Sequence, residues 1–117
     1  MVLTEVQRIL EAEIIAENGF ESVVVEKACG ADLMSDVLAH IEPGALLLSG
    51  LTNPQVVRTA EMAGVQAICF VRGKKPPQDT IALAASNGIP LLRTNLPMFE
   101  SCGRLYGEGL PGCSKGK

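Results

Sequence analysis

Polar residues that could bind an anion follow three apolar segments of the chain. The apolar segments span residues 45–48, 67–71 and 89–92, and a turn carrying Gly or Thr follows each of them. Arg72 and Arg93 occupy equivalent places in two of these turns, and two adjacent guanidinium groups would form a fork suited to phosphate or carboxylate. The candidate ligand-binding residues are Ser49, Gly50, Thr52, Asn53, Arg72, Gly73, Lys74, Arg93, Thr94 and Asn95.

A second interpretation of the same turns needs no ligand. Thr52 and Asn95 would cap the helices that follow, and the basic residues would form a solvated rim. In both interpretations the turns meet at one edge of the sheet. The loops that follow parallel strands lie on one side, where ligands usually bind and helix N-termini offer unpaired N–H groups. The sequence leaves both interpretations open.

The segments that would position these turns form a repeated strand and helix unit. Each apolar segment is short and continuous, as expected for a parallel strand covered on both faces. Helices are predicted to begin at Pro54, Pro77 and Pro97, because proline lacks the N–H group that would be unpaired at the first helical position anyway. Gly64 and Gly88 follow the first two helices, where a left-handed residue commonly ends a helix. This βαβαβα run predicts a mainly parallel sheet with helices on both faces.

The chain before this run predicts two more helices. Thr4 is expected to cap a short helix that ends by about Glu11. Asp32 stands where an N-cap would, ahead of apolar residues that recur at helical spacing as far as Ile41.

A β-hairpin is expected between these helices. Residues 13–16 and the valine-rich residues 20–26 read as strands, and Asn18-Gly19 between them is a turn that tolerates positive φ. The predicted fold class is therefore α/β, with a short helix and a hairpin ahead of the parallel sheet.

A single domain is the default for 117 residues. We place it at residues 1–107. The remaining residues, 108–117, are rich in Gly and Pro at their start, and we expect them to form a flexible tail.

Composition and charge exclude several classes of protein. The net charge is −3 and no basic run is longer than Lys74-Lys75, which argues against nucleic-acid binding. Apolar runs are strand-sized and the N-terminus lacks a secretory signal, so we expect a cytoplasmic protein that does not bind membranes.

The mean hydropathy of +0.26 suggests more apolar surface than one small core can hide, and we predict a homodimer.

No residue set specifies a reaction. Residues 107–112 match G-x-G-x-x-G, but they follow a helix, contain a proline and precede no helix, and no P-loop motif occurs. His40 is the only histidine, at the expected end of a helix, where a surface role suits it better than catalysis. The four cysteines lack CxxC spacing, so we expect reduced thiols, with Cys69 and Cys102 packed and Cys29 inert. We predict a protein without catalytic residues, metal or cofactor.

Five stretches of the chain carry a resemblance to known families, namely residues 32–39, 42–46, 49–54, 71–77 and 88–94. Together they resemble the DRTGG domain family and the N-terminal domain of HPr kinase/phosphorylase. In this chain Leu51-Thr52 stand where that family has Asp-Arg, and Val71-Arg72-Gly73 stand where it has Thr-Gly-Gly. The resemblance covers about residues 28–106.

This resemblance implies a small α/β module without known catalysis. Such modules are often attached to CBS domains or metabolic enzymes, and some stand alone beside hydrogenase subunits. We therefore expect a regulatory module that binds a small anionic metabolite or nucleotide. The alternative is an accessory subunit that docks a metabolic or redox enzyme.

Overall fold

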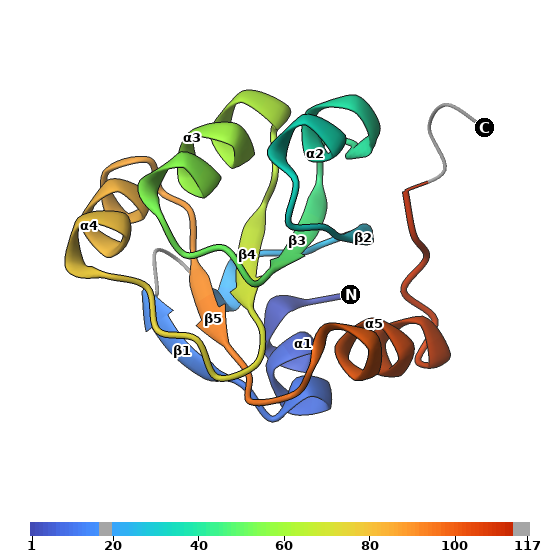
Figure 1. Ribbon diagram of the computed structural model, residues 1–117. Helices are drawn as coiled ribbons and strands as arrows, with labels where there is room; N and C mark the ends of the chain where they lie inside the picture. The colour runs from blue at the N-terminus through green and yellow to red at the C-terminus, as the bar shows by residue number, and fades with distance from the viewer. Residues whose placement is uncertain (17–19, 114–117) are drawn as a thin grey trace.

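A five-stranded sheet forms the centre of the described chain (Figure 1). The structure is a computed structural model that describes residues 1–16 and 20–113. The strand order is β1-β5-β4-β3-β2, with β2 to β5 parallel and β1 antiparallel to β5. The strands are β1 (Glu13–Ala16), β2 (Lys27–Gly30), β3 (Ala45–Ser49), β4 (Ala67–Phe70) and β5 (Leu91–Arg93).

Helices cover both faces of this sheet, as predicted. α2, α3 and α4 pack on one face, and α1 and α5 pack on the other (Figure 1). The helices are α1 (Leu3–Leu10), α2 (Met34–His40), α3 (Pro54–Ala63), α4 (Gln78–Ser86) and α5 (Met98–Gly107), with a short 3-10 helix, η1 (Phe20–Ser22), after β1.

The inner strand β3 explains the continuous apolar runs in the sequence. Leu46 and Leu48 pack against the α1 and α5 side, and Ala45 and Leu47 pack against the α2, α3 and α4 side. All four side chains are completely buried. Because side chains alternate between the faces of a strand, a strand buried on both faces must be apolar at every position.

The three predicted strand and helix units are confirmed. Pro54 is the first residue of α3, while Pro77 and Pro97 are the N-cap residues of α4 and α5. Gly64 and Gly88 follow α3 and α4 with φ angles of 73° and 68°, which L-residues with a side chain rarely adopt.

The predicted hairpin is wrong, because β1 and β2 lie at opposite edges of the sheet. Residues 20–26 form η1 and an irregular segment that pairs with the start of the chain. Leu3 N donates to Val23 O at 2.9 Å, and Val25 N donates to Met1 O at 2.8 Å. A run of valines is typical of a strand, but the backbone of this segment pairs with the first residues of the chain and not with residues 13–16. The predicted Asn18-Gly19 turn lies outside the described residues.

Two predicted N-caps are also wrong. α1 begins one residue before Thr4, with Val2 as its N-cap, and α2 has Leu33 as its N-cap. The carboxylate of Asp32 instead accepts hydrogen bonds from Ser49, the last residue of β3, and from Gly50, which follows it. Asp32 therefore holds the end of a neighbouring strand.

The segment after α5 packs on the domain as far as residue 113. The Leu110 side chain is only 3% exposed and joins the core beneath α5. Ala28 N donates to Pro111 O at 2.9 Å, and Cys113 N donates to Ala28 O at 3.3 Å. Residues 108–113 thus differ from the flexible tail that the sequence predicts, and residues 114–117 lie outside the described part of the chain.

Candidate ligand groove at the carboxyl edge of the sheet

A groove of about 150 Å³ opens at the carboxyl edge of the parallel strands. We call it the Arg72 groove. Three of the predicted ligand residues line it, and it also receives side chains from the loop after β2 and from the start of α5. Its lining residues are Asp32, Gly50, Leu51, Val71, Arg72, Lys74 and Met98.

The turn that carries Arg72 has an unusual backbone. Arg72 and Gly73 both lie in the left-handed region, with φ angles of 61° and 70°. Arg72 N donates to Leu96 O at 2.9 Å, and Gly73 N donates to Thr94 O at 2.7 Å. The loops after β4 and β5 lead to helices on opposite faces, and these two bonds join the loops where they diverge. Left-handed backbone is costly for a residue with a side chain, so Arg72 is held in strain.

Asp32 fixes the opposite wall of the groove. Its Oδ1 accepts hydrogen bonds from Gly50 N at 2.7 Å and from the buried Ser49 Oγ at 3.2 Å. Leu51 N in turn donates to Ser49 Oγ at 3.1 Å. The Gly50 N–H is thus already paired with a carboxylate, and an anion in this groove would have to be bound by Arg72 and Lys74.

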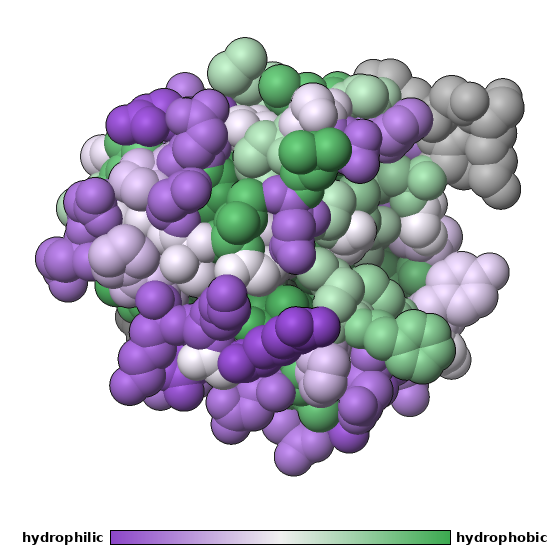
Figure 2. Space-filling view, in the orientation of Figure 1, coloured by the Kyte–Doolittle hydropathy of each residue, from purple (hydrophilic) through white to green (hydrophobic). Residues whose placement is uncertain are grey.

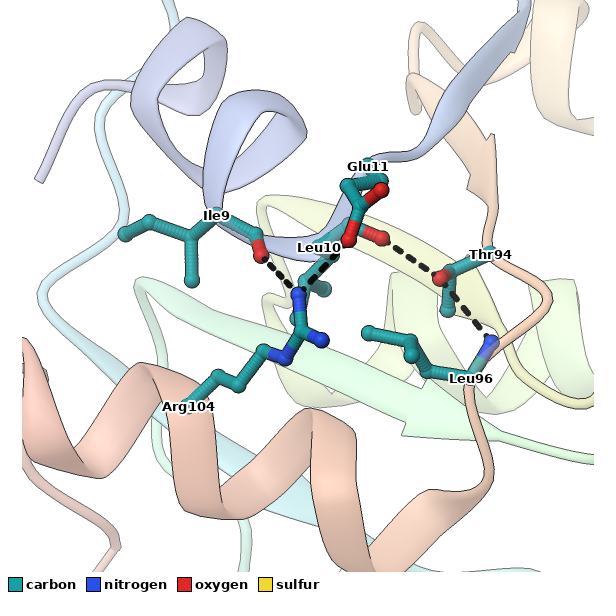
Figure 3. Close-up of polar contacts among 6 residues, drawn as sticks. All are labelled: Ile9, Leu10, Glu11, Thr94, Leu96 and Arg104. Carbon is teal, nitrogen blue, oxygen red and sulfur yellow. Dashed lines mark hydrogen bonds and ion pairs between the residues drawn. The ribbon is translucent and has the colours of Figure 1, made fainter.

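Thr94 has a structural role, because its side chain is buried and fully hydrogen-bonded (Figure 3). Its Oγ1 donates to Leu10 O at 2.7 Å and accepts from Leu96 N at 3.2 Å. Beside it, Arg104 Nη1 donates to Ile9 O at 3.2 Å and to Glu11 Oε2 at 2.9 Å. Figure 3 shows these contacts side by side, and they join the end of α1 to the loop after β5 and to α5.

The structure does not bring Arg93 into the Arg72 groove. Arg93 Nη1 lies 3.4 Å from Glu13 Oε1 on the neighbouring strand β1, where the two residues are paired in register. Arg93 lines a different groove of about 210 Å³, which we call the Arg93 groove, together with Lys75. The two arginines therefore do not line one common groove.

The other predicted site residues lie around the edge. Thr52 O accepts a hydrogen bond from Thr80 Oγ1 at 2.7 Å. Asn53 is the N-cap of α3 without a side-chain hydrogen bond, and a Cβ at Gly73 would stand 2.8 Å from Asn95 Oδ1. Neither Thr52 nor Asn95 is an N-cap, so the capping interpretation of these two residues is wrong.

The sequence of residues 5–106 matches the DRTGG domain family. The chain belongs to the DRTGG domain family. The fold also resembles a solved structure containing the CBS and DRTGG domains of the regulatory region of Clostridium perfringens pyrophosphatase, complexed with its activator, diadenosine tetraphosphate. That likeness has a TM-score of 0.76 at 23% identity, and it covers 93% of this chain and 47% of the solved chain. This DRTGG domain thus spans about half of that regulatory region. No protein of curated function matches the chain.

Four residues that line the Arg72 groove of this DRTGG domain were not among the predicted site residues. They are Asp32, Leu51, Val71 and Met98. Asp32 follows β2 by two residues, and β2 runs parallel to β3. Had residues 27–30 been recognised as a strand, the loop after them would have been placed at the same edge.

Three of the four cysteines of this DRTGG domain have thiols with raised pKa values. Burial raises the pKa of the Cys69 thiol to about 12, and it also raises the pKa values of Cys29 and Cys102. These thiols are therefore mostly protonated at neutral pH. Within residues 1–16 and 20–113, no group of three or more His, Cys, Asp or Glu side chains could hold a metal ion. No helix in the same residues is long and apolar enough to cross a membrane.

A third groove, of about 310 Å³ and lined mainly by apolar residues, lies between α5 and the segment that follows it. Ala28, Cys102, Leu110 and Pro111 contribute to its lining. Phe99 and Tyr106 stand at its side with exposures of 88% and 74%. Figure 2 shows hydrophobic side chains gathered over the right of the molecule, where α5 lies in Figure 1.

Proposed function

We propose that this DRTGG domain is a non-catalytic regulatory module that binds a small anionic metabolite or nucleotide through the Arg72 groove. The observation that carries the proposal is the pair of exposed cations, Arg72 and Lys74, on two sides of a strained turn. Neither side chain has an ion-pair partner among the described residues. Two unpaired cations on one concave surface favour a phosphate or carboxylate.

The strain at Arg72 supports a functional role for its side chain. A glycine at φ 61° would be free of the steric cost that a side chain incurs there, which is of the order of 1 kcal/mol. The presence of an arginine at this position is explained if its guanidinium group binds a ligand and so offsets the steric cost. Strained residues of this kind cluster at ligand sites.

The size of the groove limits the part of a ligand that it would hold. Its volume of about 150 Å³ is below the several hundred Å³ of pockets that enclose a drug-sized molecule. We infer that the groove receives one anionic group, while the remainder of the ligand lies over the adjacent loops. A terminal phosphate of a nucleotide fits this description. The diadenosine tetraphosphate complexed with the pyrophosphatase regulatory region is likewise a phosphate-bearing anion, although its phosphates lie between two adenosines.

The lining side chains favour binding over catalysis. The groove contains one carboxylate, which already accepts two hydrogen bonds, and two cations beside apolar residues. None of these side chains combines a nucleophile with a neighbouring base.

Adjacent lysines provide a matched test of the proposal, because Lys74 lines the Arg72 groove and Lys75 lines the Arg93 groove. ATP, diadenosine tetraphosphate, pyrophosphate and citrate would be screened by thermal shift. A ligand at a hundredfold excess over its Kd adds about 2.7 kcal/mol to the free energy of unfolding. We expect Lys74→Gln to weaken the best anion about fivefold, since exposed ion pairs contribute at most about 1 kcal/mol. Lys75→Gln should change affinity by less than about twofold by the same reasoning.

Calorimetric titration of the two variants decides the outcome. Equal losses in both would indicate diffuse attraction to a basic rim, and the Arg72 groove would no longer be the site. If none of the four anions binds the parent protein, the regulatory proposal fails in favour of the second candidate.

The second candidate is an accessory subunit that docks a metabolic or redox enzyme. The exposed Phe99 and Tyr106 beside the apolar groove favour it. Large aromatic side chains are enriched in the energetically important parts of protein interfaces. A partner that presents an apolar segment would fit this surface.

A two-fold dimer is a further expectation, made from the hydropathy of the chain and consistent with the exposed aromatic residues on α5. Light scattering at micromolar concentration should give about twice the chain mass of 12.3 kDa. A particle of 12.3 kDa would rule out the dimer under those conditions.

A further inference from the structure

Two cysteines that are far apart in the sequence lie side by side at the β2 edge of the sheet. The segment after α5 runs parallel to the edge strand β2, with Gly112 opposite Ala28. Ala28 N donates to Pro111 O at 2.9 Å, and Cys113 N donates to Ala28 O at 3.3 Å. When this register is continued by one residue, Cys29 stands opposite Cys113.

The two side chains also lie on the same face of the sheet. Cys29 and Cys113 both pack against the core cluster beneath α2, α3 and α4, whereas Ala28 packs against the opposite cluster. Neighbouring strands are spaced about 4.8 Å apart. Disulfide-bonded cysteines have Cα atoms roughly 4.4 to 6.8 Å apart, so residues opposed in this way are within bonding range.

The remaining cysteines are excluded as partners by their positions. Cys102 packs on the opposite face, and its Sγ would stand 2.8 Å from a Cβ added to Gly30. Cys69 is completely buried within the central strand β4. Of the three other cysteines, only Cys113 shares both the edge and the face of Cys29.

We propose that Cys29 and Cys113 form a reversible disulfide when the domain meets a low-molecular-weight disulfide such as glutathione disulfide. The thiolate of one cysteine attacks a sulfur of the oxidant, breaking its S–S bond and releasing one thiol. The thiolate of the other cysteine then attacks the mixed disulfide and releases the second thiol. The protein loses two electrons and two protons, and the oxidant is reduced to two thiols.

The bond would fasten the segment after α5 to the sheet. At present two backbone hydrogen bonds to Ala28 and the buried Leu110 hold that segment. The same segment forms one wall of the apolar groove, through Leu110, Pro111 and Gly112. Oxidation would therefore hold this wall in place with a covalent bond. After reduction, only the two hydrogen bonds and the packing of Leu110 would hold it.

The rate of oxidation should increase with pH. Burial, followed by the nearby Cys113 and Cys102, raises the pKa of Cys29 above its ordinary value. Cys29 is then mainly a thiol at neutral pH, and its reactive thiolate fraction increases as the pH rises toward the raised pKa. The disulfide should form slowly at pH 7 and at least several times faster at pH 8.5, as the thiolate fraction rises.

The test is oxidation of the full chain with glutathione disulfide, followed by alkylation of the remaining thiols and peptide mapping by mass spectrometry. We expect one intramolecular bond, between Cys29 and Cys113, and a melting temperature higher by roughly 10 °C, because the bond closes a long loop. Dithiothreitol should reverse both changes. Cys102→Ser should still form the bond, and both Cys29→Ser and Cys113→Ser should lose it. Cys113→Ser lies near the end of the described chain and leaves β2 intact, so it tests the bond without disturbing the sheet.

Three results would overturn the proposal. The first is a bond that joins Cys29 to Cys102, and the second is a bond that links only separate chains. The third is a native protein that stays reduced under conditions in which the urea-unfolded chain is oxidised.

Discussion

Replacing Thr94 with valine should lower the free energy of unfolding by about 3 kcal/mol. Valine keeps the shape of threonine but cannot pair with Leu10 O or Leu96 N, which the buried Thr94 Oγ1 joins at 2.7 and 3.2 Å. Each buried polar group left without a partner costs about 1 to 3 kcal/mol. The loss should be large because the hydroxyl links the end of α1 to the loop after β5 (Figure 3).

Urea unfolding of three proteins measures this effect. Thr94→Ser keeps the hydroxyl and loses one methyl group, so it should cost only about 1 kcal/mol. A valine variant as stable as the serine variant would show that the hydrogen bonds of Thr94 contribute little. A valine variant of normal stability that binds anions poorly would return Thr94 to the ligand site where sequence reasoning put it.

Replacing Arg72 with glycine should change binding and stability in opposite directions. Loss of the guanidinium group should weaken anion binding at least tenfold, because charge-assisted hydrogen bonds are worth about 1.5 to 3 kcal/mol. Glycine at φ 61° removes the strain of the side chain, although it gains entropy in the unfolded chain. The free energy of unfolding should therefore rise by about 0.5 kcal/mol.

Titration and urea unfolding of the same sample separate the alternatives for Arg72. Arg93→Gln serves as the matched control, since that arginine lines the other groove beside Glu13. It should leave affinity for the anion within about twofold of the parent value, as expected for a charge that lies outside the site and is paired with Glu13. An Arg72→Gly protein that binds normally would remove the central support for the proposed site. A large loss of stability would instead make Arg72 a structural residue.

Much of the parallel sheet could be predicted because its signals are local. Pro54, Pro77 and Pro97 each stand at the start of a helix, and Gly64 and Gly88 follow helix ends with positive φ. Each of these boundaries depends on the backbone preference of one residue, so a short window of sequence reveals it.

The features that were predicted incorrectly depend on distant partners. Residues 20–26 have a strand-like composition, but Val23 and Val25 pair with the first three residues of the chain. Aspartate is a residue type that commonly caps helices, yet the carboxylate of Asp32 accepts a hydrogen bond from Gly50 N. No local preference identifies such partners.

The same limit applies to the candidate site. Arg72 and Arg93 hold equivalent places in the repeated units, but β5 has β1 as its outer neighbour. This pairing places Glu13 opposite Arg93, and the two side chains form an ion pair. The position of Arg93 therefore depends on an antiparallel edge strand whose partner is not encoded nearby.

The order of the strands also bears on how the chain folds. From β3 to β5, each strand lies beside the strand that precedes it in the chain, and one helix joins each pair. Such contacts close short loops, whereas Thr94 and Leu10 are 84 positions apart. Because the entropy lost on loop closure grows with loop length, the parallel strands can assemble before α1 and β1 reach them. We therefore expect the start of the chain to dock last, when Thr94 Oγ1 forms its hydrogen bond to Leu10 O.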